Sequence, residues 1–364
     1  SDKQRALVYF EQALLLRRQV EDKGGEAATL NNIGAVYSAR GDKQSALEYF
    51  EQALQLRRKA GDMRGEATTL ANIGRVYTDL GATQGVLTYF EQALAHFEQA
   101  LPIYRQVGDK SGEAVIFNHI GGVYSALGNK QKALTYYEQA LPLRRQVGDK
   151  GGEATSLNNI GRVYSALGDQ QQALAHFERA LPLRRQVEDK GGEAITLTNI
   201  GGAYSALGNK QQALAYFEQA LPLFSQLGDK RGEATTLNNI GRVYSDLHDK
   251  RRAMAYFEQA LPLQRQMEDR WGEVVTRNNI AMAAAALADL ARGVEHEVVL
   301  AIDEGAHGRQ ARQRREHIVI FGATDARDVE PAHGGCDSRG DGDAQARVRW
   351  GPPCEVVCSR CTGP

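Results

Sequence analysis

Apolar side chains along residues 153–189 form two stripes, each with the spacing of one face of an α-helix. The first stripe comprises Leu157, Ile160, Gly161 and Tyr164, and the second comprises Ala173, Leu174, Phe177, Ala180 and Leu181. Between them, Gly168 is placed to end the first helix, and Asp169 is placed to cap the second, with Gln172 three residues on. Neither helix can bury its stripe alone, so the pattern predicts an antiparallel helix pair that stacks on neighbouring pairs.

Near copies of this unit recur along most of the chain. The first helix is marked by Gly34, Gly74, Gly121, Gly161, Gly201 and Gly241. Each of these glycines is followed three residues later by a tyrosine, and the step is 40 residues except for 47 between Gly74 and Gly121. A fixed period in this range is typical of solenoid proteins, in which each repeat contacts only its neighbours.

The repeated positions resemble the tetratricopeptide repeat. The matching residues are Leu157, Ile160-Gly161, Tyr164, Ala173, Phe177 and Ala180. The length of 40 residues and the Asn-Asn-Ile-Gly motif are similar to repeats of kinesin light chain, of Pins/LGN-type spindle adaptors and of large bacterial signalling proteins. The resemblance covers residues 1 to about 285 and implies an all-α, right-handed superhelical solenoid.

The repeats divide the chain into four parts. Residues 1–20 match a second helix only, so we expect either a longer natural protein upstream or an uncovered apolar face. Residues 21–270 hold six helix pairs, at 26–60, 66–107, 113–147, 153–187, 193–227 and 233–267. Residues 271–304 are predicted to form a degenerate capping helix or helices, in which Ala281 replaces the usual glycine.

Residues 305–364 lose the helical pattern and are predicted to be disordered. Arg, Gly, Ala and Asp dominate there, and leucine is absent after Leu300. Because the composition changes abruptly between residues 285 and 300, an out-of-frame reading of the gene is a second hypothesis for residues 285–364.

The 47-residue step has a cause that can be read in the sequence. Residues 90–96, FEQALAH, are followed at once by FEQAL, which indicates a duplication of seven residues inside a second helix. Seven residues turn an ideal helix by two turns to within about 20°. We therefore predict one overlong helix over 83–107, rather than a bulged loop.

Proline occupies one position late in five second helices. The residues are Pro102, Pro142, Pro182, Pro222 and Pro262. Because proline removes a hydrogen bond inside a helix, we expect a kink there; the alternative is that the helix ends before the proline.

Composition narrows the class of function. The formal net charge of the 364 residues is −1, and no apolar run is long enough to span a membrane. The balanced charge gives no support for nucleic-acid binding. All four cysteines follow residue 335, so the repeats depend on no disulfide and fit a reducing cytoplasm.

The resemblance places candidate ligand-binding residues on the first helices, which line the concave groove in this family. One column comprises Asn32, Asn72, His119, Asn159, Asn199, Asn239 and Asn279. A second comprises Asn31, Asn118, Asn158 and Asn238 and is broken by Ala71 and Thr198. A third comprises Arg75, Arg162 and Arg242 and alternates with Ala35, Gly122 and Gly202.

These columns suit an extended, acidic-leaning peptide. Asparagine carries both a donor and an acceptor and can bond a peptide backbone of any sequence, and arginine adds a forked contact to a carboxylate or phosphate. His119 interrupts the main column after the insertion, so we expect the groove to be interrupted there. The alternative is that the asparagines bond neighbouring helices and only hold the array together.

Other candidate chemistry is weaker. Paired arginines such as Arg144-Arg145 lie near the ends of second helices, where a cation suits the helix dipole without a ligand. His96 and His176 read as surface partners of a repeated helix. Cys354, Cys358 and Cys361, with Cys336 or His333, could bind zinc, but their spacing matches no familiar site, and we expect no metal.

No catalytic motif or cofactor-binding loop is present in the sequence. We therefore predict a non-catalytic scaffold without a cofactor, which binds a protein or peptide in the concave groove and involves neither nucleic acid nor membrane. The alternatives are a sensor array of a larger bacterial signalling protein, either a nucleotide-switch ATPase or a caspase-like protease, and an array that associates end to end with itself.

Overall fold

The computed structural model describes residues 2–307, 347–350 and 354–357. The helices among them are α1 (Asp2–Gln19), α2 (Lys23–Arg40), α3 (Lys43–Ala60), α4 (Met63–Gln84), α5 (Leu87–Gln106), α6 (Lys110–Ala126), α7 (Lys130–Gln146), α8 (Lys150–Ala166), α9 (Gln170–Gln186), α10 (Lys190–Ala206), α11 (Lys210–Leu227), α12 (Lys230–Asp246), α13 (Lys250–Gln266) and α14 (Arg270–His307). The strands are β1 (Arg347–Trp350) and β2 (Cys354–Val357).

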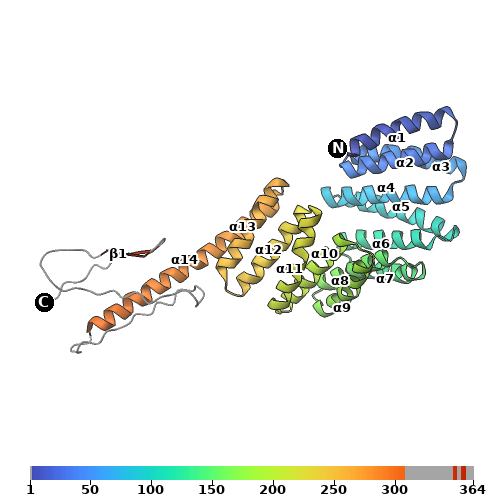
Figure 1. Cartoon of the computed structure of the whole chain (residues 1–364). Coiled ribbons are helices and arrows are strands. Elements are labelled where there is room, and N and C mark those ends of the chain that lie inside the picture. The colour runs from blue at the N-terminus through green and yellow to red at the C-terminus, as the bar shows by residue number, and fades with distance from the viewer. Residues whose placement is uncertain (1, 308–346, 351–353, 358–364) are drawn as a thin grey trace. The chain divides into compact units, whose positions relative to one another are not determined.

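Residues 1–301 form one compact unit of stacked antiparallel helix pairs (Figure 1). Each even-numbered helix from α2 to α12 is the first of a pair and packs on the odd-numbered helix that follows it. Each second helix from α3 to α11 also packs on the first helix of the next pair, and α1 packs on α2 as a second helix would. This unit is the all-α, right-handed solenoid that the repeat pattern predicts.

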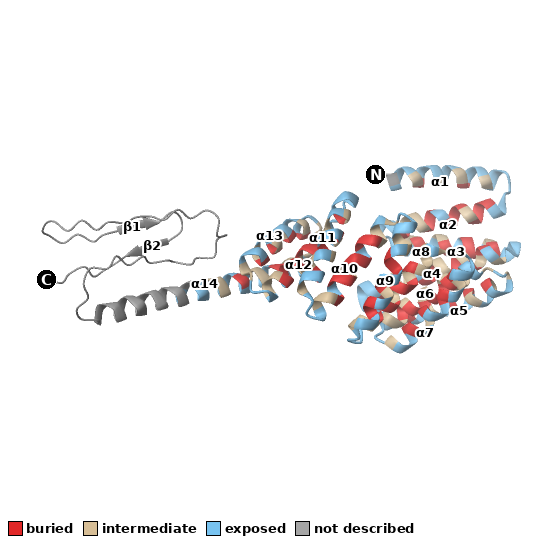
Figure 2. Cartoon of the chain, turned by 60° about the horizontal axis from the view of Figure 1, so that its bottom comes forward, coloured by how far each residue is buried: buried red, intermediate tan, exposed pale blue. Residues whose placement is uncertain are grey.

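The core of each pair is a close contact between a glycine and an aromatic ring. Phe177 of α9 is 1% exposed and lies over Gly161 of α8. A Cβ atom placed on Gly161 would lie 2.6 Å from that ring, so no larger residue fits without movement. We call this contact between a glycine and a ring a seat, and it recurs in the other pairs. Figure 2 shows buried residues along the facing sides of the helices.

Aspartate determines where most first helices begin. Asp149 accepts a hydrogen bond from the backbone N–H of Gly152 at 2.8 Å, and α8 starts at Lys150 rather than at the expected residue 153. The predicted cap of the second helix is confirmed, because Asp169 accepts from the N–H of Gln172 at 3.0 Å. A side-chain acceptor at this position satisfies an N–H that lacks a partner within the helix.

Each proline lies inside its helix rather than beyond its end. Pro182 is within α9, which continues to Gln186, and the other four prolines take the same place in α5, α7, α11 and α13. The alternative that the helix ends before the proline is therefore wrong, and the kink stays a prediction.

The insertion lengthens two helices instead of one. α4 has 22 residues and α5 has 20. The prediction of a single overlong helix over 83–107 is therefore wrong, because α4 ends at Gln84 and α5 begins at Leu87. Gly74 faces Phe97 and Gly81 faces Phe90, which are two seats seven residues apart on both helices. Because the hairpin is antiparallel, an insertion near its tip adds length to both of its arms.

The C-terminal part of the chain adds few described residues. The first turns of α14 continue the repeat pattern, since Glu273 pairs with Arg265 of α13 at 2.8 Å. Within the unit of residues 302–364, β1 and β2 pair antiparallel, with Arg347 opposite Val357. Most of the predicted disordered tail lies outside the described residues, as do Cys336, Cys358, Cys361 and His333 of the zinc alternative.

Candidate functional site

The first helices form the inner layer of the solenoid. α2, α4, α6, α8 and α10 each contact the next first helix in the series, whereas the second helices in the described array have no such contacts with one another. In a curved stack, successive pairs lie closer together on the concave side than on the convex side. Helices that contact their equivalents in the next pair therefore lie on the concave side. The residues of the predicted site columns all belong to these inner helices, except Asn279, which lies in α14.

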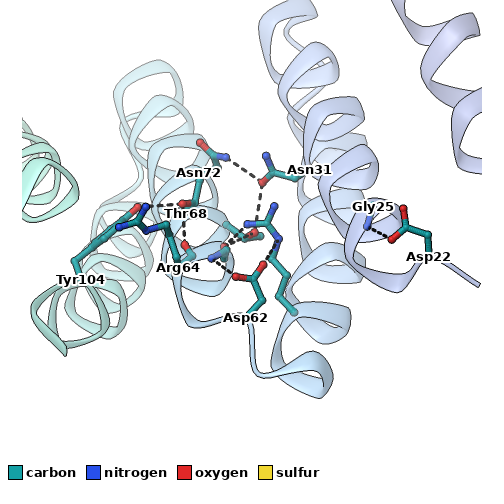
Figure 3. Close-up of polar contacts among 11 residues, drawn as sticks. Asp22, Gly25, Asn31, Asp62, Arg64, Thr68, Asn72 and Tyr104 are labelled. Atoms are coloured by element: carbon teal, nitrogen blue, oxygen red, sulfur yellow. Dashed lines mark hydrogen bonds and ion pairs between the residues drawn. The ribbon is translucent and has the colours of Figure 1, made fainter. Parts of the chain in front are cut away.

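Asparagines of neighbouring inner helices bond one another. Asn72 Nδ2 donates to Asn31 Oδ1 at 3.1 Å across the seam between α4 and α2 (Figure 3). Asn159 donates to Asn118 at 3.3 Å and Asn199 to Asn158 at 3.0 Å in the same way. We call this series of bonds the asparagine ladder, and it joins the first predicted column to the second. Some of the hydrogen-bonding groups of these side chains are therefore already used within the fold.

A hydroxyl side chain completes each rung of this ladder. Thr69 Oγ1 approaches Asn31 Oδ1 at 3.4 Å, and Thr276 Oγ1 of α14 donates to Asn238 Oδ1 at 3.0 Å. Ser156 and Thr196 take the equivalent place beside Asn118 and Asn158, each at 3.5 Å. Sequence analysis missed these hydroxyls, although a column of Ser or Thr three residues before the asparagine was present as a signal.

The ladder breaks where its acceptor is missing. Ala71 stands at the acceptor position of α4, and the next inner helix carries Ile116 and His119 where other seams have Thr or Ser and Asn. An asparagine at residue 119 would have no partner across this seam. The three substitutions therefore compensate one another, and they lie next to the lengthened hairpin α4–α5.

His119 packs as an aromatic group rather than as a ligand-binding one. Its ring stacks on Phe97, with 5.4 Å between ring centroids and 7° between the planes. Burial lowers the pKa of His119 to about 4, and the nearby positive charges of Arg75 and Arg144 act in the same direction. The imidazole is therefore neutral at pH 7.

His96 and His176 are also stacking partners. The ring of His96 lies 5.6 Å from that of Tyr77, and the ring of His176 lies 5.5 Å from that of Tyr164. Both are partly buried, and burial is the main cause that lowers their pKa values. The expectation of surface histidines is therefore wrong, because their rings cover the tyrosines of the first helices.

The paired arginines at the ends of second helices serve the seams. Arg58, Arg145 and Arg185 each bind a glutamate in the first turn of the next helix, at 2.7, 2.6 and 2.7 Å. Arg184 binds Asp189 at 2.6 Å and reaches Thr155 at 2.8 Å. These arginines therefore have a structural role at the helix ends, as the sequence indicated in preference to a phosphate-binding ridge.

The third column differs, because its guanidinium groups have no ion pair or hydrogen bond among the described residues. Arg75, Arg162 and Arg242 are all exposed on inner helices. Arg162 lies four residues after Asn158, on the same helix face as the ladder. Asp79 and Asp246, four residues after Arg75 and Arg242, pair instead with Lys43 and Lys210, each at 2.5 Å.

Open space alternates with these arginines. A Cβ atom on Gly202 would have no atom within 4 Å, and one on Gly122 would meet only the Tyr137 hydroxyl at 3.8 Å. These glycines are thus unlike Gly201 and Gly121 beside them, whose hydrogen atoms face a ring. From the second pair to the sixth, this position of the inner face alternates between arginine and glycine.

The remaining predicted residues divide by exposure. Asn32 is exposed, whereas Asn239 and Asn279 are partly buried, and no hydrogen bond of their side chains is present among the described residues. The described residues contain no group of three or more His, Cys, Asp or Glu that could hold a metal. Within the same residues, no helix has the length and apolar character needed to cross a bilayer.

A family profile described as tetratricopeptide repeat matches residues 3–59, 89–146, 112–186, 153–226 and 192–266. A second tetratricopeptide repeat profile matches residues 67–107. Together they cover most of the chain, and the chain belongs to the tetratricopeptide repeat family. No curated protein matches it as a relative.

Solved structures show the same fold at low sequence identity. A signal transduction ATPase with numerous domains from Pyrococcus horikoshii, which has a tetratricopeptide repeat sensor, matches 81% of this chain at 16% identity and a TM-score of 0.62. This chain spans 45% of that protein. The apo form of the quorum sensor NprR from B. thuringiensis matches 82% of this chain and 83% of its own, at 18% identity and a TM-score of 0.60.

Proposed function

We propose that this chain is a non-catalytic interaction array that binds an extended, acidic-leaning peptide along its concave face. The observation that carries the proposal is the column of Arg75, Arg162 and Arg242, which are exposed and unpaired among the described residues. Charged arginine forms strong, forked hydrogen bonds with carboxylates. The asparagine ladder contributes by holding the inner helices in register and by offering the remaining amide groups to a peptide backbone.

The test is capture of peptides by the full chain. A variant with Arg75→Gln, Arg162→Gln and Arg242→Gln loses three positive charges from the inner face. Its matched control carries Arg179→Gln, Arg231→Gln and Arg270→Gln, which removes three exposed arginines outside the column. We expect the wild type and the control to capture the same acidic peptides from a random peptide library, and the column variant to lose them.

Equal capture by all three proteins would overturn the proposed groove. Arginine is a better target than asparagine in this experiment. Removing Asn159 and Asn199 would break two rungs of the ladder and would confuse loss of a ligand with loss of structure.

A regulatory role in a larger signalling protein is a second candidate, by analogy with the sensor repeats of the Pyrococcus protein. The likeness itself concerns the fold. Sequencing of the gene upstream of the codon for Ser1 tests this candidate. A continuous reading frame that encodes an ATPase or protease domain would support it, and a stop codon directly upstream would contradict it.

End-to-end self-association is favoured by apolar side chains at the two ends of the array. Leu15 and Leu16 of α1 are each 61% exposed, and Trp271 and Met282 of α14 are 77% and 66% exposed. Ala281 opposes this candidate, because it stands where a glycine would have to receive the ring of a second helix. A mass that rises with protein concentration in light scattering would support association, and a constant monomer mass would exclude it.

A further inference from the structure

The arginine column has a period of two helix pairs. Arg75, Arg162 and Arg242 each follow the seat glycine of the second, fourth and sixth pairs, and Gly122 and Gly202 take this position in the third and fifth. A glycine inside a helix costs about 1 kcal/mol relative to alanine. Gly202 gains no close packing in return, because a Cβ there would meet no atom within 4 Å.

Open backbone at Gly122 and Gly202 leaves room for a ligand between the arginines. Inner helices of neighbouring pairs contact each other directly, and packed helices lie about 8–10 Å apart. Two steps therefore separate successive arginines by roughly 16–20 Å, a distance that an extended chain covers in about five or six residues.

From this geometry we infer that the groove selects a peptide with anionic side chains about six residues apart, one for each arginine of the column. The inference rests on the proposed function and adds the spacing of the ligand's charges. Carboxylates and phosphorylated side chains share the chemistry that arginine recognises. The segments between the anions pass over Gly122 and Gly202 and need small or apolar side chains rather than charges.

The test compares synthetic peptides of one composition. In the first, three glutamates lie at positions 3, 9 and 15 of an 18-residue peptide rich in Ala, Ser and Thr; in the second, they are adjacent. We expect the full chain to bind the first peptide about tenfold more tightly in fluorescence anisotropy, as one or two additional charged hydrogen bonds would give. A third peptide with phosphoserine at the same positions identifies which anion the groove prefers.

A double-mutant cycle fixes the register. Arg162→Gln should weaken the binding of the first peptide about tenfold and leave unchanged the binding of a version with glutamine at position 9. Arg179→Gln, on the outer helix α9, should change neither peptide. This pattern assigns the central glutamate to Arg162, whereas equal losses for both peptides would overturn the assignment.

The two proposals fail in different ways. Equal affinity for spaced and adjacent glutamates, with loss of both in the triple arginine variant, would overturn the six-residue spacing and leave the acidic groove intact. Failure of every acidic peptide to bind would overturn both proposals, provided that circular dichroism shows the helices of the wild-type chain.

Discussion

Adjacent glycines in one inner helix have opposite functions. The absence of a side chain at Gly201 leaves room for the ring of Phe217, since a Cβ would lie 2.7 Å from that ring. Gly202, one residue later, faces open space. The same pair of neighbours recurs as Gly121 and Gly122, so one dipeptide combines a packing requirement with an opening on the concave face.

These two glycines predict opposite changes in stability. Gly201→Ala should lower the free energy of unfolding by about 2 kcal/mol, because the buried ring must move. Gly202→Ala should raise it by about 0.5–1 kcal/mol, because alanine favours the helix and meets nothing. Urea denaturation of both variants measures the difference. A rise of both midpoints would contradict the packing at Gly201, and a fall of both would contradict the open space at Gly202.

His119 predicts an acid-sensitive seam between the second and third pairs. Its pKa is lowered to about 4 in the folded chain, from an ordinary value near 6.5. Stability from the neutral imidazole is therefore complete above about pH 6.5 and falls as the pH drops toward 4. Arg75, Arg144 and Asp79 are the charged groups that act on it.

The matched variant is His119→Asn, since asparagine takes this position in the other inner helices. Between pH 7.5 and pH 5, the wild type should lose on the order of 1–2 kcal/mol more unfolding free energy than the variant. The carboxylates and the other histidines are common to both proteins and cancel in the comparison. Equal losses in urea melts at both pH values would show that His119 is protonated freely in the folded chain.

At the scale of the element, the hairpin α4–α5 shows how packing overrides a stop signal. Leu80-Gly81 matches Leu127-Gly128, which ends α6, yet α4 continues through Gly81 to Gln84. Gly81 faces the ring of Phe90, with 2.8 Å between that ring and an added Cβ. Gly85 takes the left-handed conformation instead, at φ 68°, and ends the helix.

Deletion of residues 90–96 should move the end of α4 back to Gly81. The shortened hairpin would bring Phe97 within 16 residues of Gly74, the spacing of the other pairs, so the seat at Gly74 is kept. We expect a cooperatively folded chain in which the amides of residues 82–84 lose protection from hydrogen exchange. Retained protection there would mean that α4 is long for reasons within its own sequence.

For the whole array, stability should be a sum of pairs and seams. Contacts in residues 1–301 join only neighbouring helices and neighbouring pairs, as in a one-dimensional lattice. Each seam carries the packing of a second helix on the next first helix, most carry an Arg–Glu ion pair, and three carry an asparagine rung. A local defect should therefore open the array locally.

Gly241→Ala and Gly161→Ala test this expectation, because both place a methyl group against the ring of a seated phenylalanine. The change at Gly241 should cause loss of amide protection in α12, α13 and the first turns of α14, while α2–α9 stay protected. The change at Gly161 should weaken the centre and lower protection on both sides of it. Uniform loss along the array in both variants would indicate a single cooperative unit.

Much of this structure was readable from the sequence. The apolar spacing in residues 153–189 and its repetition determined the helix pairs, their order and the family, because a stripe that one helix cannot bury requires stacked partners. The positions of the inner-face asparagines and arginines followed from the same register. The Asp149 cap was missed because its three following residues, Lys-Gly-Gly, carry no apolar signal.

Only the tertiary structure decided what the inner residues contact. The sequence showed equal columns of asparagine and arginine, but the fold pairs Asn72, Asn159 and Asn199 across seams and leaves Arg75, Arg162 and Arg242 exposed. It also divided the insertion between two helices, because antiparallel arms must lengthen together to keep their seats aligned. A periodic sequence determines which residues share a face, whereas the contacts between neighbouring repeats determine which of them remain available to a ligand.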